Sequence, residues 1–151
     1  MMVAAMALTD YPSSKTYTAK YKGQQSNGTP HGNGWQRLTN GDEYTGTFEN
    51  GLFHGYGEMK NVYGVVKYRG NYANGKRNGN GYGTDYDGDY KGNFKDDEYD
   101  GQGELSTSVW TYTGQFELGT RCGYGTIVYK DETTVVGNFV NGLPRGKVVK
   151  T

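Results

Sequence analysis

The sequence of 151 residues contains one cysteine, three prolines and no excess of either charge, with 16 basic and 16 acidic residues. A single cysteine, Cys122, excludes an internal disulfide framework and is typical of a reducing compartment. A net charge of zero provides no overall attraction to nucleic acid or to an anionic membrane. We therefore expect no nucleic-acid partner, and we place membrane lipid second to protein as a partner.

Long hydrophobic runs are also missing. The apolar run at residues 1–8 lacks a basic leader and is too short for a secretory signal or a membrane span. Residues 1–15 contain no copy of the repeat described below and include Pro12-Ser13-Ser14, which predicts a flexible lead-in. These features favour a cytoplasmic protein, with an association with the cytoskeleton or with a membrane as a further expectation.

Aliphatic residues are too scarce for an ordinary globular core. Only 33% of the residues are hydrophobic, whereas 26 are glycine and 15 are tyrosine. Apolar contacts must then come mainly from aromatic rings, whose polar tips tolerate partial exposure. This composition predicts a thin, elongated structure rather than a compact globule.

What the chain does contain is a repeat of 22–24 residues, most complete from Tyr44 to Gly57. Counting its first tyrosine as position 0, glycine follows at +2, an aromatic residue at +4, and glycine at +7, +11 and +13. Together with +20, these positions hold 25 of the 26 glycines, which random composition would scatter. Periods of this length are typical of stacked supersecondary units. The frame begins at Tyr21, Tyr44, Tyr68, Tyr90, Tyr112 and Val135.

Each repeat predicts one β-hairpin. Residues 44–49 alternate with the period of a strand, and Asn50-Gly51 is the strongest local signal for a tight hairpin turn. No segment has the period of an amphipathic helix. We therefore predict an all-β fold, an elongated single antiparallel sheet of stacked β-hairpins with about a dozen short strands. The array covers residues 16–151, and its sixth repeat, which starts at 135, is a partial cap.

The first strand of each repeat places positions 0, +2 and +4 on one face. The glycine at +2, such as Gly46, leaves a gap into which a ring of the next repeat is expected to lean. The rings at 0 and +4 then form a ladder along the sheet, in part a core and in part the lining of a shallow groove. The predicted partner-binding residues are Tyr44, Phe48, Tyr68, Tyr72, Tyr90, Phe94, Tyr112 and Phe116, and the ladder continues to Tyr21 and Phe139.

The unit Tyr-x-Gly-x-aromatic-x-x-Gly-x-x-His-Gly-x-Gly, seen most fully in residues 44–57, resembles the MORN (membrane occupation and recognition nexus) repeat. The resemblance implies an antiparallel sheet of hairpins that acts as a non-catalytic scaffold, as a dimerisation unit, or as a groove for a partner's extended or helical segment. Lipid headgroup binding has also been proposed for this family. We therefore expect a protein-interaction scaffold in cytoskeletal or membrane-associated assembly, with a homodimer as a further expectation.

Residues with catalytic or metal-binding chemistry are few and scattered. His31, His54 and Cys122 occupy the +10 position of different repeats, and we interpret them as parts of the repeat rather than as metal ligands. The stretch Asp85-Tyr86-Asp87-Gly88-Asp89 alternates acids like a calcium loop but lacks the glycine and glutamate that the EF-hand requires. No nucleophile, base and orienting group occur together. We expect no enzyme activity, no cofactor and no metal site.

A short basic stretch keeps a second hypothesis open. It forms a candidate charge patch for phospholipid headgroups. Tyrosine-rich hairpins can also stack choline or glycans on their rings. The alternative function is therefore a module that binds phospholipid headgroups, glycans or choline. The residues of this candidate patch are Lys60, Lys67, Arg69, Lys76 and Arg77.

Overall fold

The computed structural model describes residues 16–151, so the predicted flexible lead-in at 1–15 lies outside the described residues. The strands are short and follow one another without helices between them. They are β1 (Lys20–Ser26), β2 (Thr29–Arg37), β3 (Glu43–Glu49), β4 (Leu52–Lys60), β5 (Val66–Ala73), β6 (Lys76–Asp85), β7 (Gly88–Lys95), β8 (Glu98–Ser106), β9 (Trp110–Glu117), β10 (Thr120–Tyr129), β11 (Thr134–Val140) and β12 (Leu143–Lys150).

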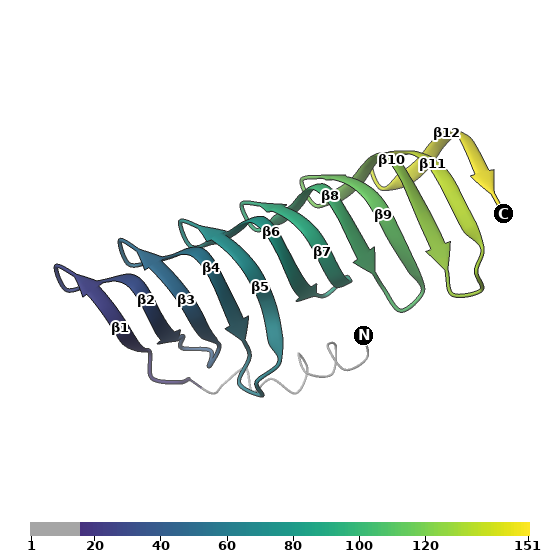
Figure 1. Ribbon diagram of the computed structural model, residues 1–151. Coiled ribbons are helices and arrows are strands. Elements are labelled where there is room, and N and C mark those ends of the chain that lie inside the picture. The colour runs from purple at the N-terminus through teal and green to yellow at the C-terminus, as the bar shows by residue number, and fades with distance from the viewer. Residues whose placement is uncertain (1–15) are drawn as a thin grey trace.

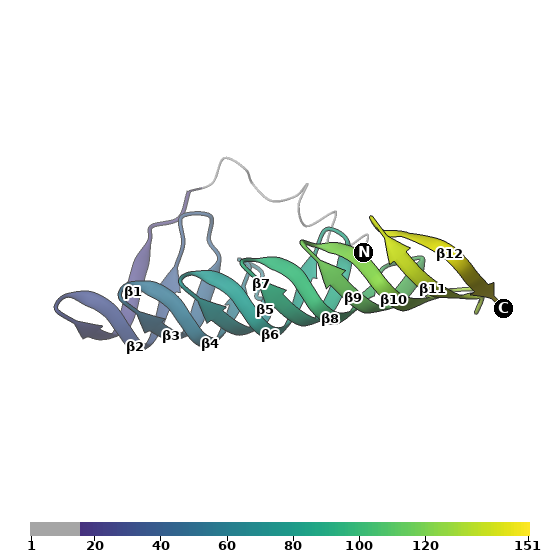
Figure 2. The ribbon, with the colours of Figure 1, turned by 90° about the horizontal axis from the view of Figure 1, so that it is seen from above.

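These strands form one antiparallel sheet in which each strand pairs with its neighbours in the sequence. Figure 1 shows a row of hairpins that runs from the purple N-terminal end to the yellow C-terminal end, and Figure 2 shows the same row from above. The predicted all-β fold of stacked hairpins is confirmed. Within residues 16–151, no helix is long and apolar enough to span a membrane.

A two-residue turn closes each hairpin, because its residues adopt a left-handed backbone. Asn50 and Gly51 have φ angles of 50° and 83°, as a type I′ turn requires. Two hairpins lack an Asn-Gly pair and still form the same turn. The φ angles are 48° and 72° at Asp96-Asp97, and 49° and 78° at Leu118-Gly119. Strand pairing on both sides therefore overrides the weaker turn preference of these two pairs.

The glycine at +11 lies in a β-bulge. In the second repeat the pairing passes from Gly46 with Gly57 to Phe48 with Phe53, so the second strand contains extra residues. Gly55 lies inside this bulge with a φ of 80°, and every glycine at +11 has a positive φ. A side chain is disfavoured in this conformation. The bulge thus explains why the +11 position is glycine in all six repeats.

The glycines at +2 and +13 make room for the tyrosine of their own repeat. Gly46 pairs with Gly57, and the Tyr44 ring lies over both, so that a Cβ on Gly57 would lie 2.3 Å from Tyr44 Oη. The Tyr44 hydroxyl donates a 2.8 Å hydrogen bond to the carbonyl oxygen of Thr47. The expectation that a ring of the next repeat fills the gap at Gly46 is therefore wrong. Tyr44 is two residues away on the same strand and fills the gap itself.

Aromatic rings form the core on one face of the sheet, which we call the ring face. Tyr44, Tyr90 and Tyr112 have no exposed area. A flat single sheet would leave such rings open to water on one side. The strands are curved rather than flat (Figure 1). Rings of the same and of neighbouring repeats also pack on one another, as Tyr44 does on Phe48 and Tyr72, and these contacts cover the rings.

Candidate functional site: the ring face

The structure places all eight predicted groove residues on the ring face but buries them, from 0% exposed for Tyr44 to 6% for Tyr72. Each buried tyrosine at position 0 has edge-to-face contacts with the rings at +4 of its own repeat and of the next. For Tyr44 the centroid distances are 5.1 Å to Phe48 and 5.2 Å to Tyr72. The eight rings therefore form the core rather than an open groove, because they satisfy one another. A partner would meet the residues that cover them.

The covering residues lie at position +9, which the sequence prediction missed. The two-residue turn pairs +9 with +4 across the hairpin, as in Phe53 with Phe48 and Arg121 with Phe116. An Asn-Gly turn fixes this register, so the sequence did contain the signal. Rings and guanidinium groups alternate in the middle of this row. Its residues are Pro30, Phe53, Arg77, Tyr99, Arg121 and Pro144.

Phe53 and Tyr99 cover the core by stacking. The Phe53 ring lies 4.0 Å from the Tyr44 ring, with 16° between their planes, and the Tyr99 ring lies 3.9 Å from the Tyr90 ring, with 7° between theirs. A guanidinium group is also planar and also stacks on aromatic rings. Arginine at +9 can therefore replace phenylalanine or tyrosine without a change in the backbone.

Arg77 is a neutralised cation in this row. Its guanidinium carbon lies 4.7 Å from the centre of the Phe94 ring. Nη1 donates to both carboxylate oxygens of Asp85, at 3.1 and 3.0 Å, and Nη2 donates to the carbonyl oxygen of Asp97 at 2.6 Å. Nε lies 3.5 Å from Oδ1 of Asp97. The Tyr99 hydroxyl completes the cluster with a 3.0 Å hydrogen bond to Asp85.

Arg121 lies among aromatic rings without such carboxylates. Its guanidinium carbon is 4.6 Å from the ring centre of Trp110 and 5.7 Å from those of Tyr112 and Phe139. Nη2 donates a 2.6 Å hydrogen bond to the carbonyl oxygen of Gly142. Among the described residues, no carboxylate forms an ion pair with Arg121. Desolvation by its surroundings lowers the pKa of the Arg121 guanidinium.

A hollow of about 300 Å³ opens beside Arg121. Leu105, Trp110 and Phe116 provide apolar walls, and Asp87, Thr107 and Thr120 add polar groups to the lining. Asp87 forms no ion pair with Arg121. A hollow with apolar walls, one cation and one carboxylate can bind a side chain.

The structure does not assemble the candidate charge patch. Arg77 pairs with Tyr72 and lies on the ring face, whereas Lys76, paired with Ala73, lies on the opposite face. Four of the five basic groups are already ion-paired, which leaves little free charge for a headgroup. Lys60 and Arg69 pair with Glu58 at 3.3 and 2.9 Å, Lys67 pairs with buried Asp42 at 2.6 Å, and Arg77 pairs with Asp85 and Asp97.

The residues at +10 stay apart and have separate surroundings. His54 Nε2 lies 3.1 Å from Glu49 Oε2, and His31 Nδ1 accepts a 3.4 Å hydrogen bond from the amide of Asn50. Burial raises the pKa of the Cys122 thiol, so less of the nucleophilic thiolate is present at neutral pH. Within the part of the chain that the structure describes, no three potential metal ligands come together.

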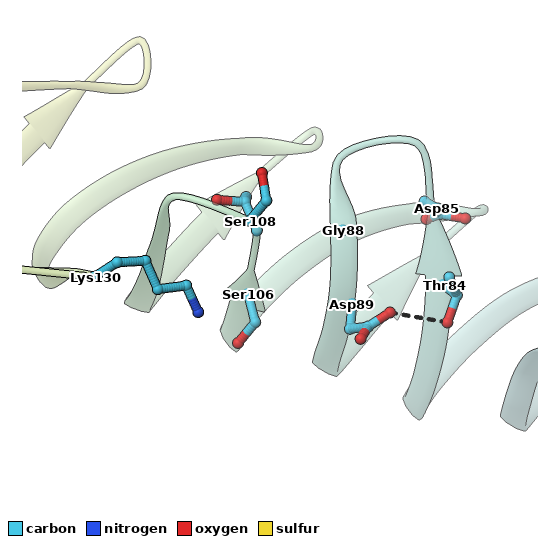
Figure 3. Close-up of a pocket in the computed structure, with 8 residues that line it drawn as sticks. Thr84, Asp85, Gly88, Asp89, Ser106, Ser108 and Lys130 are labelled. Atoms are coloured by element: carbon cyan, nitrogen blue, oxygen red, sulfur yellow. Dashed lines mark hydrogen bonds between the residues drawn. The ribbon is translucent and has the colours of Figure 1, made fainter. Parts of the chain in front are cut away.

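A second hollow, of about 260 Å³, lies beside the loops opposite the two-residue turns (Figure 3). Thr84 donates a 3.0 Å hydrogen bond to Asp89, and Lys130 reaches in from the loop after β10. Asp85 also lines this hollow, but Arg77 already holds its carboxylate. The lining is polar and its charges are mixed, so the hollow has no pronounced preference for one class of ligand.

Comparisons with known proteins agree with this description. The model of the MORN repeat matches at residues 21–43, 44–64, 68–89, 90–108 and 112–134, and these matches begin at the first five predicted repeat starts. The chain is also 33% identical to Alsin of Rattus norvegicus over a stretch that covers 83% of this chain and 8% of Alsin. It thus spans a small fraction of that relative's length. MORN repeats generally form non-catalytic repeat modules. With five matched repeats in one sheet of stacked hairpins, the chain belongs to the MORN repeat family.

Proposed function

We propose that this array is a protein-interaction module whose ring face holds an extended or helical segment of a protein partner. The observation that carries the proposal is that Phe53 and Arg121 of the +9 row, with Trp110 beside Arg121, are partly exposed above a rigid aromatic core. Aromatic and arginine side chains contribute most of the energy in many protein interfaces. A rigid support reduces the entropy that such side chains lose on binding.

A module of this kind acts without catalysis, by holding proteins together in the cytoplasm at the cytoskeleton or at a membrane. A homodimer is a second mode of assembly that we propose, since β1 and β12 are the open edges of the sheet. Unpaired edge strands can pair with a second chain. Light scattering tests this mode. A monomer at all concentrations would contradict the homodimer and leave the proposal for the ring face unaffected.

Two substitutions on one strand test the ring face. Phe53 lies on the ring face of β4, whereas Tyr56 lies on the opposite face and is 59% exposed. Proteins captured from a lysate are identified by mass spectrometry, purified, and titrated against each variant. We expect Phe53→Lys to weaken binding and Tyr56→Lys to leave it unchanged, with melting temperatures confirming that both variants fold. Loss of binding in Tyr56→Lys alone would move the interface to the opposite face and refute the proposal.

A direct binding assay distinguishes the protein-interaction module from the alternative function, a module that binds phospholipid headgroups, glycans or choline. The probes are vesicles with phosphatidylserine or phosphoinositides, and a glycan array that includes choline. We expect no binding to either, because Lys76 is the one candidate patch residue without an ion pair among the described residues. Vesicle binding that Lys76→Glu abolishes would favour the lipid alternative.

A further inference from the structure

Arg77 and Arg121 occupy equivalent places in two different repeats. Both lie at +9, and Nη2 of each donates a 2.6 Å hydrogen bond to the carbonyl oxygen at +7 of the next repeat, which is Asp97 or Gly142. The amides of Asp97 and Gly142 in turn donate to the carbonyl oxygens of Arg77 and Arg121, at 3.0 and 3.1 Å. The backbone therefore holds the two arginines in the same way.

The carboxylates that neutralise Arg77 have no counterpart beside Arg121. Asp85, at +17 of the repeat of Arg77, is replaced by Tyr129, and Asp97 is replaced by Gly142. In the described part of the chain, the Arg121 guanidinium donates a single hydrogen bond, to the Gly142 carbonyl oxygen. A guanidinium carries five N–H donors. Most N–H donors of Arg121 therefore have no protein acceptor. At the equivalent place in the earlier repeat, the Arg77 guanidinium binds the carboxylate of Asp85.

The surroundings of Arg121 favour a ligand from outside the array. A partly buried charge without a counterion is unfavourable, and the contacts with Trp110 and Tyr112 offset part of this cost. The same contacts restrict the plane of the guanidinium, so little entropy is lost when an anion binds. The hollow beside it, of about 300 Å³, has room for the carbon atoms of a side chain.

We propose that Arg121 and the hollow beside it form a recognition site for a carboxylate, supplied by a glutamate or aspartate in the segment that the ring face binds. This inference deepens the proposed function by naming the chemistry of the partner. The carboxylate would accept hydrogen bonds from Arg121 as Asp85 accepts them from Arg77, while its aliphatic stem packs beside the partly exposed Trp110. The partner is therefore an acidic peptide segment.

A carboxylate fits this site better than a phosphate group. Arg121 is the sole cation among the residues that line the hollow, and Asp87 also lines it. A monoanion can be neutralised there, whereas a phosphate dianion would keep an uncompensated charge near Asp87. The equivalent cation, Arg77, is itself satisfied by aspartate carboxylates.

The test uses the full chain and a capped tetraglutamate peptide, with capped tetraglutamine as its neutral control. Binding is followed by NMR at Trp110 Nε1–H and Arg121 Nε–H. We expect tetraglutamate to shift both signals to saturation and tetraglutamine to shift neither. Arg121→Gln should weaken tetraglutamate binding about tenfold or more, with Trp110 as the reporter, because hydrogen bonds to a charged group are lost. Lys130→Gln, which removes a cation outside this hollow, should leave the affinity unchanged.

A second variant tests the comparison with Arg77 without removing the arginine. Gly142→Asp restores the residue type that Asp97 provides, and a Cβ at Gly142 would lie 3.8 Å from Arg121 Nη2. The backbone tolerates this change, since Asp97 has a φ of 72° where Gly142 has 80°. We expect Gly142→Asp to fold normally, to shift the Arg121 Nε–H signal without peptide, and to abolish tetraglutamate binding.

The outcomes separate the site from the proposed function. Unchanged tetraglutamate affinity in folded Arg121→Gln, or in folded Gly142→Asp, would overturn the carboxylate site. Tighter binding of inorganic phosphate, or Arg121-dependent binding to anionic vesicles without peptide binding, would also overturn it, as would a dimer that Arg121→Gln dissociates. Tetraglutamate binding through Arg121 would support the site even if Phe53→Lys kept full partner binding, a result that would refute the proposed function alone.

Discussion

Gly103→Ala is the sharpest test of how the repeat is packed. A Cβ on Gly103 would lie 2.2 Å from Oη and 2.4 Å from Cζ of Tyr90. The backbone at Gly103 is not left-handed, so the effect is steric alone. Tyr90 is fully buried and stacks on Tyr99, and its hydroxyl donates a 2.8 Å hydrogen bond to the Asn93 carbonyl oxygen. The added methyl group therefore requires the ring to leave its site.

The cost follows from what the displaced ring loses. Burial of a large apolar side chain contributes roughly 1.5–3 kcal/mol. Aromatic contacts add about 0.5–1.5 kcal/mol per pair, and a hydrogen bond adds about 0.5–1.5 kcal/mol. Partial relaxation returns some of this loss, so we expect Gly103→Ala to lower the free energy of unfolding by roughly 3–5 kcal/mol. Urea unfolding followed by circular dichroism measures it.

Two further glycines serve as controls in the same assay. Gly34→Ala makes the same clash, 2.4 Å from Tyr21 Oη, but Tyr21 is partly exposed at the end of the array, so we expect a loss of about 1–2 kcal/mol. Gly64→Ala adds a Cβ in open space at a φ of 80° and should cost about 1 kcal/mol from backbone strain. A loss for Gly103→Ala no larger than that for Gly64→Ala would refute the account of the glycine lattice.

Three other predictions concern the core, the neutralised arginine and the array. Burial raises the pKa of Tyr44 to about 12. The folded state therefore keeps a proton that Tyr44 loses in the unfolded state above pH 10, its ordinary pKa. The contribution of Tyr44 to the free energy of unfolding should be complete below pH 10 and should fall as pH rises toward 12. Phenolate absorbance that appears without loss of the β-sheet signal would contradict this. Asp97→Asn should cost about 1–3 kcal/mol in urea unfolding, whereas Asp96→Asn in the same turn should change little, and equal losses would be inconsistent with the cluster. Gly92→Val should lower the melting temperature more than Gly137→Val, because a break in the middle separates more neighbours; equal shifts would exclude this.

The sequence predicted the fold because its main signals are local. Asn50-Gly51 specifies a turn within two residues, and the six-fold glycine spacing specifies how often that turn recurs. The direction of each ring was not predictable in the same way. Whether Tyr44 fills the gap at its own Gly46 or at the next repeat depends on how far the hairpin bends. The glycine at +11 marks the bulge, but it does not specify the direction in which the ring turns.

The candidate site was predicted less well, because burial depends on the whole array. The pattern of rings identified the face that carries the aromatic core, but it could not show that neighbouring repeats close over Phe48 and Phe94. The isolation of Arg121 was hidden for a related reason. It is visible only when Tyr129 and Gly142 are recognised as the equivalents of Asp85 and Asp97. This requires the knowledge that the residues at +17 and at +7 of the next repeat lie beside the side chain at +9.

The residues at +9 therefore differ between repeats while the fold stays the same, which lets the surface of the ring face change without a change in folding. The backbone is fixed by the glycines and by the rings at 0 and +4. Different planar groups at +9 pack on these rings, as Phe53 does on Tyr44 and Arg77 does on Tyr68. Charge at +9 can then vary without loss of the fold. When the carboxylates around such a charge are present, as for Arg77, the group strengthens the array. When they are absent, as for Arg121, most N–H donors of the guanidinium have no protein acceptor. We therefore propose that partner recognition arises where a repeat keeps its cation but loses its counterions.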